Sequence, residues 1–254
     1  MVLPEEIGDA AQDEDLERVK AWLQNGGSVD DQDAEGYTLL HCCACGRRVS
    51  PYSCIRAGHV SIARHLLALG AAPEIPDTAS GGSPLLAASR CHGEASADMV
   101  RVLLDAGADA NFIDKGGDRP LWEAIKNNDD SSEGLNRALL VVRMLVRAGA
   151  SLDCPSHVTA EVRIQGNWGS APWSDDERVV AMRTLVEGVR AAGTWAAYAK
   201  LPRKRVLRLR SLVARGRAKD PTDPIVARVF RLPNELCWHV LQFWRATDAT
   251  GEVF

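Results

Sequence analysis

The feature that most constrains the fold is a short segment, Leu-Leu-x-x-Gly-Ala or a close variant, that occurs four times along the chain. The four copies close at Gly26, Gly70, Gly107 and Gly149. In the most complete copy, residues 82–114, apolar residues at helical spacing precede the glycine, which predicts two short helices and then an extended turn. Glycine suits that point because it ends a helix in a conformation that a Cβ would resist. Segments that recur in this way fold as stacked units rather than around one globular core.

A second recurring segment opens the units, as Gly-Tyr-Thr-Leu-Leu-His, Gly-Gly-Ser-Pro-Leu-Leu and Gly-Asp-Arg-Pro-Leu-Trp from residues 36, 81 and 117. Thr or Pro ahead of Leu favours the start of a helix. Together the two segments resemble the ankyrin repeat, G-x-T-P-L-H-x-A-A followed by L-L-x-x-G-A-D-x-N. The resemblance implies an all-α solenoid of helix pairs with short hairpin loops, and a non-catalytic role as a protein–protein interaction scaffold.

The repeats are longer than the ankyrin period of about 33 residues. We expect the extra residues between the first and second helix of three repeats, at residues 45–57, 90–97 and 127–136. Insertions at one equivalent point fall on one face of a stacked array, and that face is often used for binding. Neutral variation in loop length explains them equally well, since surface loops tolerate insertion.

Three regions are predicted. Residues 1–154 form an ankyrin repeat domain of about four repeats, the first of them an acidic N-terminal cap. Residues 155–193 form an irregular connection, rich in Gly, Ser, Asn and Pro up to residue 173, and then a degenerate repeat with a helix over 175–192. Residues 194–254 form a helical C-terminal box or cap.

Composition narrows the class of protein. No apolar run approaches the ~18 residues of a membrane span, and the acidic N-terminus lacks the features of a signal peptide. Seven cysteines, an odd number, do not indicate a disulfide framework. We therefore predict a cytoplasmic protein, with the nucleus as an alternative, and no membrane partner. The sequence has no Gly-rich phosphate loop, nucleophile elbow or H-E-x-x-H motif, so we predict no enzymatic activity and no cofactor.

One cluster of residues has the spacing of a metal site. Cys42, Cys45, Cys54 and His59 would supply four tetrahedral zinc ligands. The ankyrin pattern, however, places small or apolar residues where the first cysteines stand and a bracing histidine at His59, and buried thiols behave as small hydrophobes. We predict packing here rather than metal.

Partner contacts are expected at the hairpin tips, the first-helix surfaces and the inserted loops. Aromatic and arginine side chains are enriched at binding hot spots. The candidates are Tyr37, Arg47, Arg48, Tyr52, Asp118 and Trp122.

The C-terminal tail has a different character. Residues 200–219 are rich in Lys and Arg and contain no acid, a Pro-rich turn follows, and residues 232–244 resemble the first helix of an F-box, L-P-x-E-L-x-x-x-I-L. The whole tail resembles a suppressor-of-cytokine-signalling (SOCS) box. That resemblance implies a substrate-recognition adaptor of a ubiquitin ligase, with the tail recruiting elongin and a cullin. The recruiting residues would be Leu232, Pro233, Leu236, Val240, Phe243 and Trp244.

Two other interpretations of the tail remain open. It can be a helical cap over the last repeat, since the ends of solenoids need one. Its basic helix can also bind nucleic acid, although the tail lacks the array of stacking aromatic residues that single-strand binders use.

Overall fold

The computed structural model of the protein describes residues 2–45, 55–91, 93–126, 131–153, 159–168 and 175–201, and four single residues beyond them. It divides into two units, residues 1–190 and residues 191–254. All regular structure in the described residues is helical apart from one isolated β-bridge, which confirms the predicted all-α class. The helices of the first unit are α1 (Glu5–Gln12), α2 (Leu16–Gln24), α3 (Leu39–Cys45), α4 (Ala57–Ala68), α5 (Pro84–Arg90), α6 (Ser96–Asp105), α7 (Pro120–Lys126), α8 (Ser132–Arg147), α9 (Ala160–Trp168) and α10 (Glu177–Ala192), the last of which runs just past the boundary.

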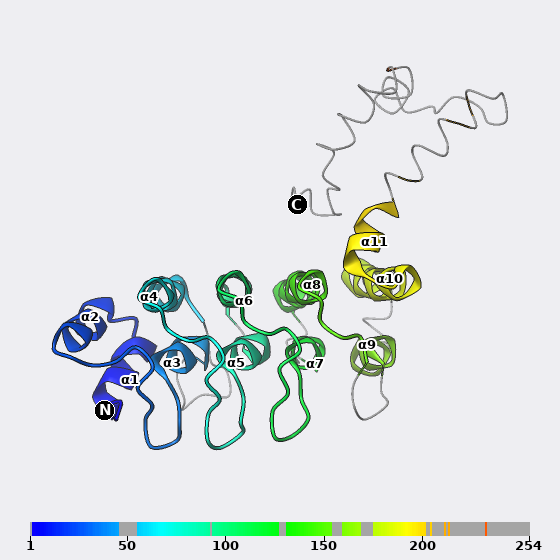
Figure 1. The fold of residues 1–254 in the computed structure, drawn as a ribbon. Helices are drawn as coiled ribbons and strands as arrows, with labels where there is room; N and C mark the ends of the chain where they lie inside the picture. Colours follow the sequence, from blue (N-terminus) through cyan, green and yellow to red (C-terminus); the bar gives the residue numbers. More distant parts are fainter. Residues whose placement is uncertain are drawn as a thin grey trace. The chain divides into compact units, whose positions relative to one another are not determined.

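Consecutive helices pair into repeats, and the repeats stack in two rows (Figure 1). Contacts run along an inner row from α1 through α3, α5 and α7 to α9, and along an outer row from α2 through α4 and α6 to α8. Leucines with almost no exposed side chain, Leu40, Leu85 and Leu121, occupy the same position in successive inner helices. Each repeat therefore buries its apolar face against its neighbours, as expected for a solenoid.

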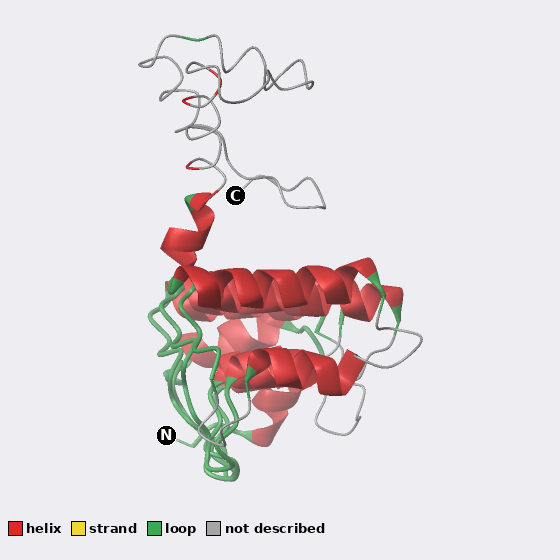
Figure 2. Cartoon of the chain, turned by 90° about the vertical axis from the view of Figure 1, so that its right-hand side faces the viewer, coloured by secondary structure: helices red, strands yellow, loops and turns green. Residues whose placement is uncertain are grey.

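The loops between repeats form a second ordered layer along one side of the helices (Figure 2). The backbone N–H of Thr78 donates to the carbonyl of Glu35 at 2.9 Å, and the N–H of Lys115 donates to the carbonyl of Ser80 at 2.9 Å. Each hairpin is thus tied to the next by a main-chain hydrogen bond at an equivalent place. Gly70 shows why the closing glycines recur, because its φ of +91° lies in the left-handed region.

Aspartate side chains stabilise the hairpins by accepting hydrogen bonds from main-chain N–H groups of the same hairpin. The carboxylate of Asp33 accepts from the N–H groups of Glu35 and Tyr37, and that of Asp114 accepts from the N–H groups of Gly116 and Asp118. Asp77 does the same for the middle hairpin. These bonds satisfy main-chain donors that a tight turn leaves unpaired.

The structure corrects the prediction of an irregular connection over residues 155–173, because α9 occupies residues 160–168 and packs against α7. The sequence signature fails here because the helix has neither the Thr-Pro-Leu opening nor a Gly-Ala close. Arg190 of α10 holds the carboxylate of Glu161 in α9 at 2.6 Å. The helices α9 and α10 thus follow the fourth repeat as a further helix pair, which is called the fifth repeat below.

A second correction concerns the fourth repeat. The apolar pattern predicts a helix from Ala138, after a loop that ends at Asn136, whereas α8 begins at Ser132. The hydroxyl of Ser131 accepts from the N–H of Gly134 at 2.9 Å and caps the helix. Because Ser131 caps the helix, α8 begins six residues before the apolar pattern starts at Ala138.

In the second unit the structure describes α11 (Trp195–Ala199), which begins at the capping side chain of Thr194. The rings of Trp195 and Tyr198 lie 5.8 Å apart on this helix. The proposed recruitment residues lie outside the described part of the tail, apart from Leu232.

Candidate functional site

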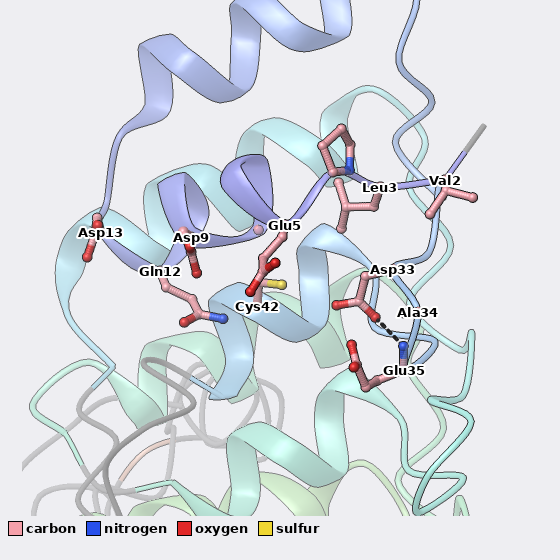
Figure 3. Close-up of a pocket in the computed structure, with 12 residues that line it drawn as sticks. Val2, Leu3, Glu5, Asp9, Gln12, Asp13, Asp33, Ala34, Glu35 and Cys42 are labelled. Carbon is pink, nitrogen blue, oxygen red and sulfur yellow. Dashed lines mark hydrogen bonds between the residues drawn. The ribbon is translucent and has the colours of Figure 1, made fainter.

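A hollow of about 660 Å³ lies between α1 and the first hairpin (Figure 3). One wall is the N-terminal segment and α1, the other is the turn at Asp33 to Glu35, and Cys42 of α3 contributes to the lining. It belongs to the inner row of helices, where repeat arrays present their extended binding surfaces. The lining residues are Val2, Leu3, Pro4, Glu5, Gly8, Asp9, Gln12, Asp13, Asp33, Ala34, Glu35 and Cys42.

The pattern of α1 places its acids on one stripe. Glu5, Asp9 and Asp13 follow one another at four-residue spacing, so their side chains lie on the same face of the helix. Ile7 and Ala11 lie on another face and are buried. Packing of that apolar face against the solenoid therefore turns the three carboxylates toward the hollow and the solvent.

The opposite wall is held by the hydrogen bonds of its own turn. The Asp33 carboxylate accepts from the N–H of Tyr37 at 2.8 Å, and the carbonyl of Glu35 accepts from both the N–H and the hydroxyl of Thr78. Residues 33–35 are thus fixed to the second hairpin. They form the wall of the hollow opposite α1.

The negative charge of α1 is not compensated by the described residues that line the hollow. Glu5, Asp9 and Asp13 have no ion-pair partner among the described residues. Their neighbours differ, because Glu6 faces Arg18 at 3.7 Å and Glu14 faces Arg56 at 3.2 Å. Clustered charge of one sign in a concave site attracts ligands of the opposite sign. The hollow is therefore suited to a cationic group.

Buried cysteines line the base of the second repeat. Cys42 is 2% exposed and Cys43 is fully buried, and burial raises the pKa of the Cys43 thiol well above its ordinary value. The thiols act as small packing groups, as predicted. Among the described residues no group of three metal-ligating side chains is close enough to hold an ion, and Cys54 lies outside them.

Two histidines brace adjacent repeats, as the family pattern predicts. His41 interacts with the hydroxyl of Thr38 through Nδ1 and with the carbonyl of Gly82 through Nε2, at 3.0 and 3.1 Å. His59 accepts from the N–H of Arg56 and reaches the carbonyl of Gln12 at 2.9 Å. Both rings are buried with both nitrogens engaged, so His59 has no free nitrogen to offer a metal.

The residues that the sequence proposes as partner contacts are scattered. Tyr37 is half-buried and makes an edge contact with the ring of His41 at 5.5 Å, and Asp118 is half-buried in the third hairpin. Arg47, Arg48 and Tyr52 lie outside the described residues. None of the described candidates lines the hollow.

The structure corrects the prediction that Trp122 is a partner contact. It is 2% exposed, so its side chain is not available on the surface as a partner contact. It takes the histidine position of the repeat, which points between neighbouring units, and the guanidinium of Arg163 covers its ring at 5.6 Å. The indole therefore packs the fourth repeat against the fifth.

The hollow itself was not predicted from the sequence. Its charged residues come from α1 and the first hairpin, and none of them belongs to the recurring segments. The available signal was the four-residue spacing of Glu5, Asp9 and Asp13, which marks one helix face.

Comparison with protein-family models gives two matches. A model described as ankyrin repeats (3 copies) matches residues 52–156, and one described as ankyrin repeats (many copies) matches residues 9–50. A comparison with curated proteins gave no significant match. None of the helices described in the structure is long and apolar enough to cross a membrane.

Proposed function

Because residues 9–156 belong to the ankyrin-repeat family, we propose that the chain is a non-catalytic interaction protein that binds a basic segment of a protein partner in the hollow of its first two repeats. Ankyrin repeats support protein–protein interaction; the basic character of the partner is our inference from the site. The observation that carries it is the stripe of uncompensated carboxylates on α1.

The composition of the walls suits lysine and arginine in particular. Their long apolar stems pack on apolar surface while the charged head reaches a polar group. The hollow offers Val2, Leu3 and Pro4 at one end and acids along its length. A peptide with two or three basic side chains would pack their apolar stems against Val2, Leu3 and Pro4, and would place their charged groups beside the acids.

A matched pair of variants tests the proposal. The first neutralises the stripe with Glu5→Gln, Asp9→Asn and Asp13→Asn, and the second neutralises three exposed acids elsewhere with Glu94→Gln, Glu133→Gln and Glu187→Gln. Both remove the same charge, so non-specific attraction changes equally. Nine-residue basic, neutral and acidic peptides are screened against the full chain, and binding is quantified by calorimetry.

We expect basic peptides alone to bind, with affinity lowered at least tenfold by the first variant and little by the second. Equal loss in both variants would mean that net charge, rather than the hollow, attracts the peptide. Undiminished binding to the first variant would place the site elsewhere.

The alternative function rests on the resemblance of the tail to a SOCS box. In that case the repeats hold a substrate and residues 232–244 recruit elongin and a cullin. Leu236→Asp would then abolish capture of purified elongin without changing the melting temperature. If the tail is only a cap, the same substitution lowers the melting temperature and elongin is not captured by either form.

We also propose a reducing compartment, the cytoplasm or the nucleus. Cys43 and Cys45 are free thiols in the structure. The observation that tests this proposal is the location of a fluorescently tagged full chain in cells.

A further inference from the structure

A basic segment of the chain begins at the end of α11 and presents two lysines to solvent. Residues 200–219 are rich in Lys and Arg and contain no acid. Lys200 and Lys204 are exposed, and the N–H of Lys204 donates to the carbonyl of Lys200 at 3.0 Å, which is the hydrogen bond of a helix. Side chains four residues apart on a helix lie on the same face. Neither lysine has an ion-pair partner among the described residues.

Two acids of α1 have the same spacing as these lysines. Glu5 and Asp9 are exposed, and they lie on one side of α1 (Figure 3). Four residues of an α-helix rise about 6 Å, so the pair of acids and the pair of lysines cover equal lengths. In the commonest crossing of two packed helices, the rows of residues four apart on each helix run side by side. Each lysine then meets an acid.

Apolar surface lies beside the acids. Val2 lines the hollow together with Leu3 and Pro4, and its side chain is 69% exposed. The apolar stem of a lysine packs on such a surface while its ammonium group reaches a polar partner. The α1 side of the hollow therefore complements the exposed lysines in charge, in spacing and in apolar contact.

We infer that the hollow binds the basic segment, beginning at Lys200, of a second copy of this chain, so that copies associate head to tail. The inference rests on the proposed function, because it identifies the basic partner of the hollow. The contact joins two different surfaces of the same chain. Such heterologous contacts extend from copy to copy unless the assembly closes into a ring.

The lengths of the elements favour a second copy over the same chain. The hollow lies at α1, and the inner row continues through α3, α5 and α7 to α9 (Figure 1). Packed helices are about 8 to 10 Å apart, so about 30 to 40 Å separate the hollow from the fifth repeat. From Ala192, where α10 ends, to Lys204 the chain includes α11 and spans only about 20 Å.

Two charge-reversed forms of the full chain test the inference. The acid-reversed chain carries Glu5→Lys and Asp9→Lys, and the lysine-reversed chain carries Lys200→Glu and Lys204→Glu. All four positions are exposed, so we expect both chains to fold. Sedimentation over a range of protein concentrations, at low and at high salt, measures the self-association of each chain and of their mixture.

A matched control reverses two basic residues elsewhere. Arg64→Glu with Arg147→Glu makes the same change of net charge as the lysine-reversed chain, at exposed positions of α4 and α8. This control separates the effect of the lysine pair from that of net charge.

We expect the intact chain and the control to associate reversibly, and high salt to weaken the association because it screens the charges. Each reversed chain alone should associate at least tenfold more weakly, because like charges then face each other. An equimolar mixture of the two should regain the association, since each supplies the charge that the other lacks. If the lysine-reversed chain does not fold, Lys200→Gln with Lys204→Gln should weaken association several-fold.

Three results would overturn the inference. They are an intact chain that is monomeric at every concentration, equal weakening in the control, and a mixture of reversed chains that does not associate. The proposed function fails separately, because it depends on the binding of the basic peptides measured by calorimetry. Basic peptides that bind the hollow of a strictly monomeric chain would support the proposed function and contradict head-to-tail association.

Discussion

The guanidinium of Arg163 lies over the indole of Trp122, 5.6 Å from the ring centroid, and joins the fourth repeat to the fifth. Two repeats earlier the same position holds His41, whose Nε2 meets the carbonyl of Gly82 in the next hairpin at 3.1 Å. One position thus links neighbouring repeats by two different interactions. The change from histidine to tryptophan exchanges a hydrogen bond for a cation–π contact.

The first prediction concerns that contact. Arg163→Ala should lower the free energy of unfolding by about 0.5 to 1 kcal/mol, because a cation over an aromatic face contributes that much when partly exposed. Urea denaturation measures the loss. In a Trp122→Leu background the same substitution should cost much less, so a double-mutant cycle isolates the contact. An unchanged cost in both backgrounds would mean that Arg163 acts through some other neighbour.

The second prediction concerns His41. His41→Leu leaves the buried N–H of Thr38 without its acceptor, while the Gly82 carbonyl keeps the N–H of Asp77 as a donor. The substitution should destabilise the chain by about 1 to 3 kcal/mol, the usual cost of leaving a buried polar group unpaired. The third repeat already has Leu86 at the equivalent position, so leucine fits the space. His65→Leu is the control, since the ring of His65 makes no hydrogen bond with any of the described residues. Equal costs for the two substitutions would contradict a bracing role.

The recurring segments predicted the repeats well because each of their residues has one structural role, such as starting or ending a helix. Thr38 and Ser83 stand at the starts of inner helices, and glycines such as Gly70 end outer ones at a positive φ. These tasks depend on local backbone geometry, so they can be recognised without knowing the neighbours. The number of helix pairs up to residue 154 followed directly.

The features that could not be predicted from the sequence depend on contacts between segments that are distant along the chain. Helix α9 is held by α7 and by Arg190, and neither contact leaves a local signature. Trp122 looked like an exposed hot spot because its burial is set by α9. The hollow requires Asp33 to face α1, and that placement follows from the stacking of the first two repeats.

The third prediction concerns the pH dependence of stability. Burial raises the pKa of Asp77, but hydrogen bonds from the side chain and N–H of Ser80 and from the N–H of Gly82 outweigh it, so the pKa lies below the ordinary value of 3.8. A carboxyl with a lowered pKa in the folded state stabilises the fold above its unfolded pKa, and this stabilisation is lost as the pH falls through the folded pKa.

Asp77→Asn should therefore cost about 1.5 to 3 kcal/mol at pH 7, the range for hydrogen bonds to a charged group. The difference from the unmodified chain should shrink as the pH falls below about 4. Urea denaturation at pH 7, 5 and 3 gives the curve, with the exposed Asp105→Asn as the control. A cost that does not change with pH would show that the charge of Asp77 contributes nothing.

The fourth prediction compares two glycines inside helices. A Cβ at Gly8 of α1 would meet Cys42 Sγ at 3.5 Å, an ordinary contact, whereas a Cβ at Gly58 of α4 would lie 2.7 Å from the Cβ of Glu14. Gly8→Ala should stabilise the chain by about 0.5 to 1 kcal/mol through helix propensity. Gly58→Ala should destabilise it, because it displaces a carboxylate that accepts from the N–H of residue 58 and pairs with Arg56. Thermal unfolding of both variants checks the opposite signs, and a shift in the same direction for both would contradict this account of the second repeat.

The last prediction is that one substitution in the hollow, Asp9→Asn, stabilises the fold but weakens the binding of basic peptides. Asp9 lies in the last turn of α1, where a negative charge opposes the helix dipole, and Glu5 and Asp13 repel it from one turn away on either side. Asp9→Asn should therefore raise the melting temperature by about 1 to 3 °C at low salt, and the gain should fade in 1 M salt because the charges are screened. The same substitution should weaken the binding of basic peptides. A destabilised variant would mean that Asp9 has a structural partner, and a stabilised variant with full binding would remove Asp9 from the site. Opposite changes in the two measurements are expected only if the carboxylates are kept together for a ligand.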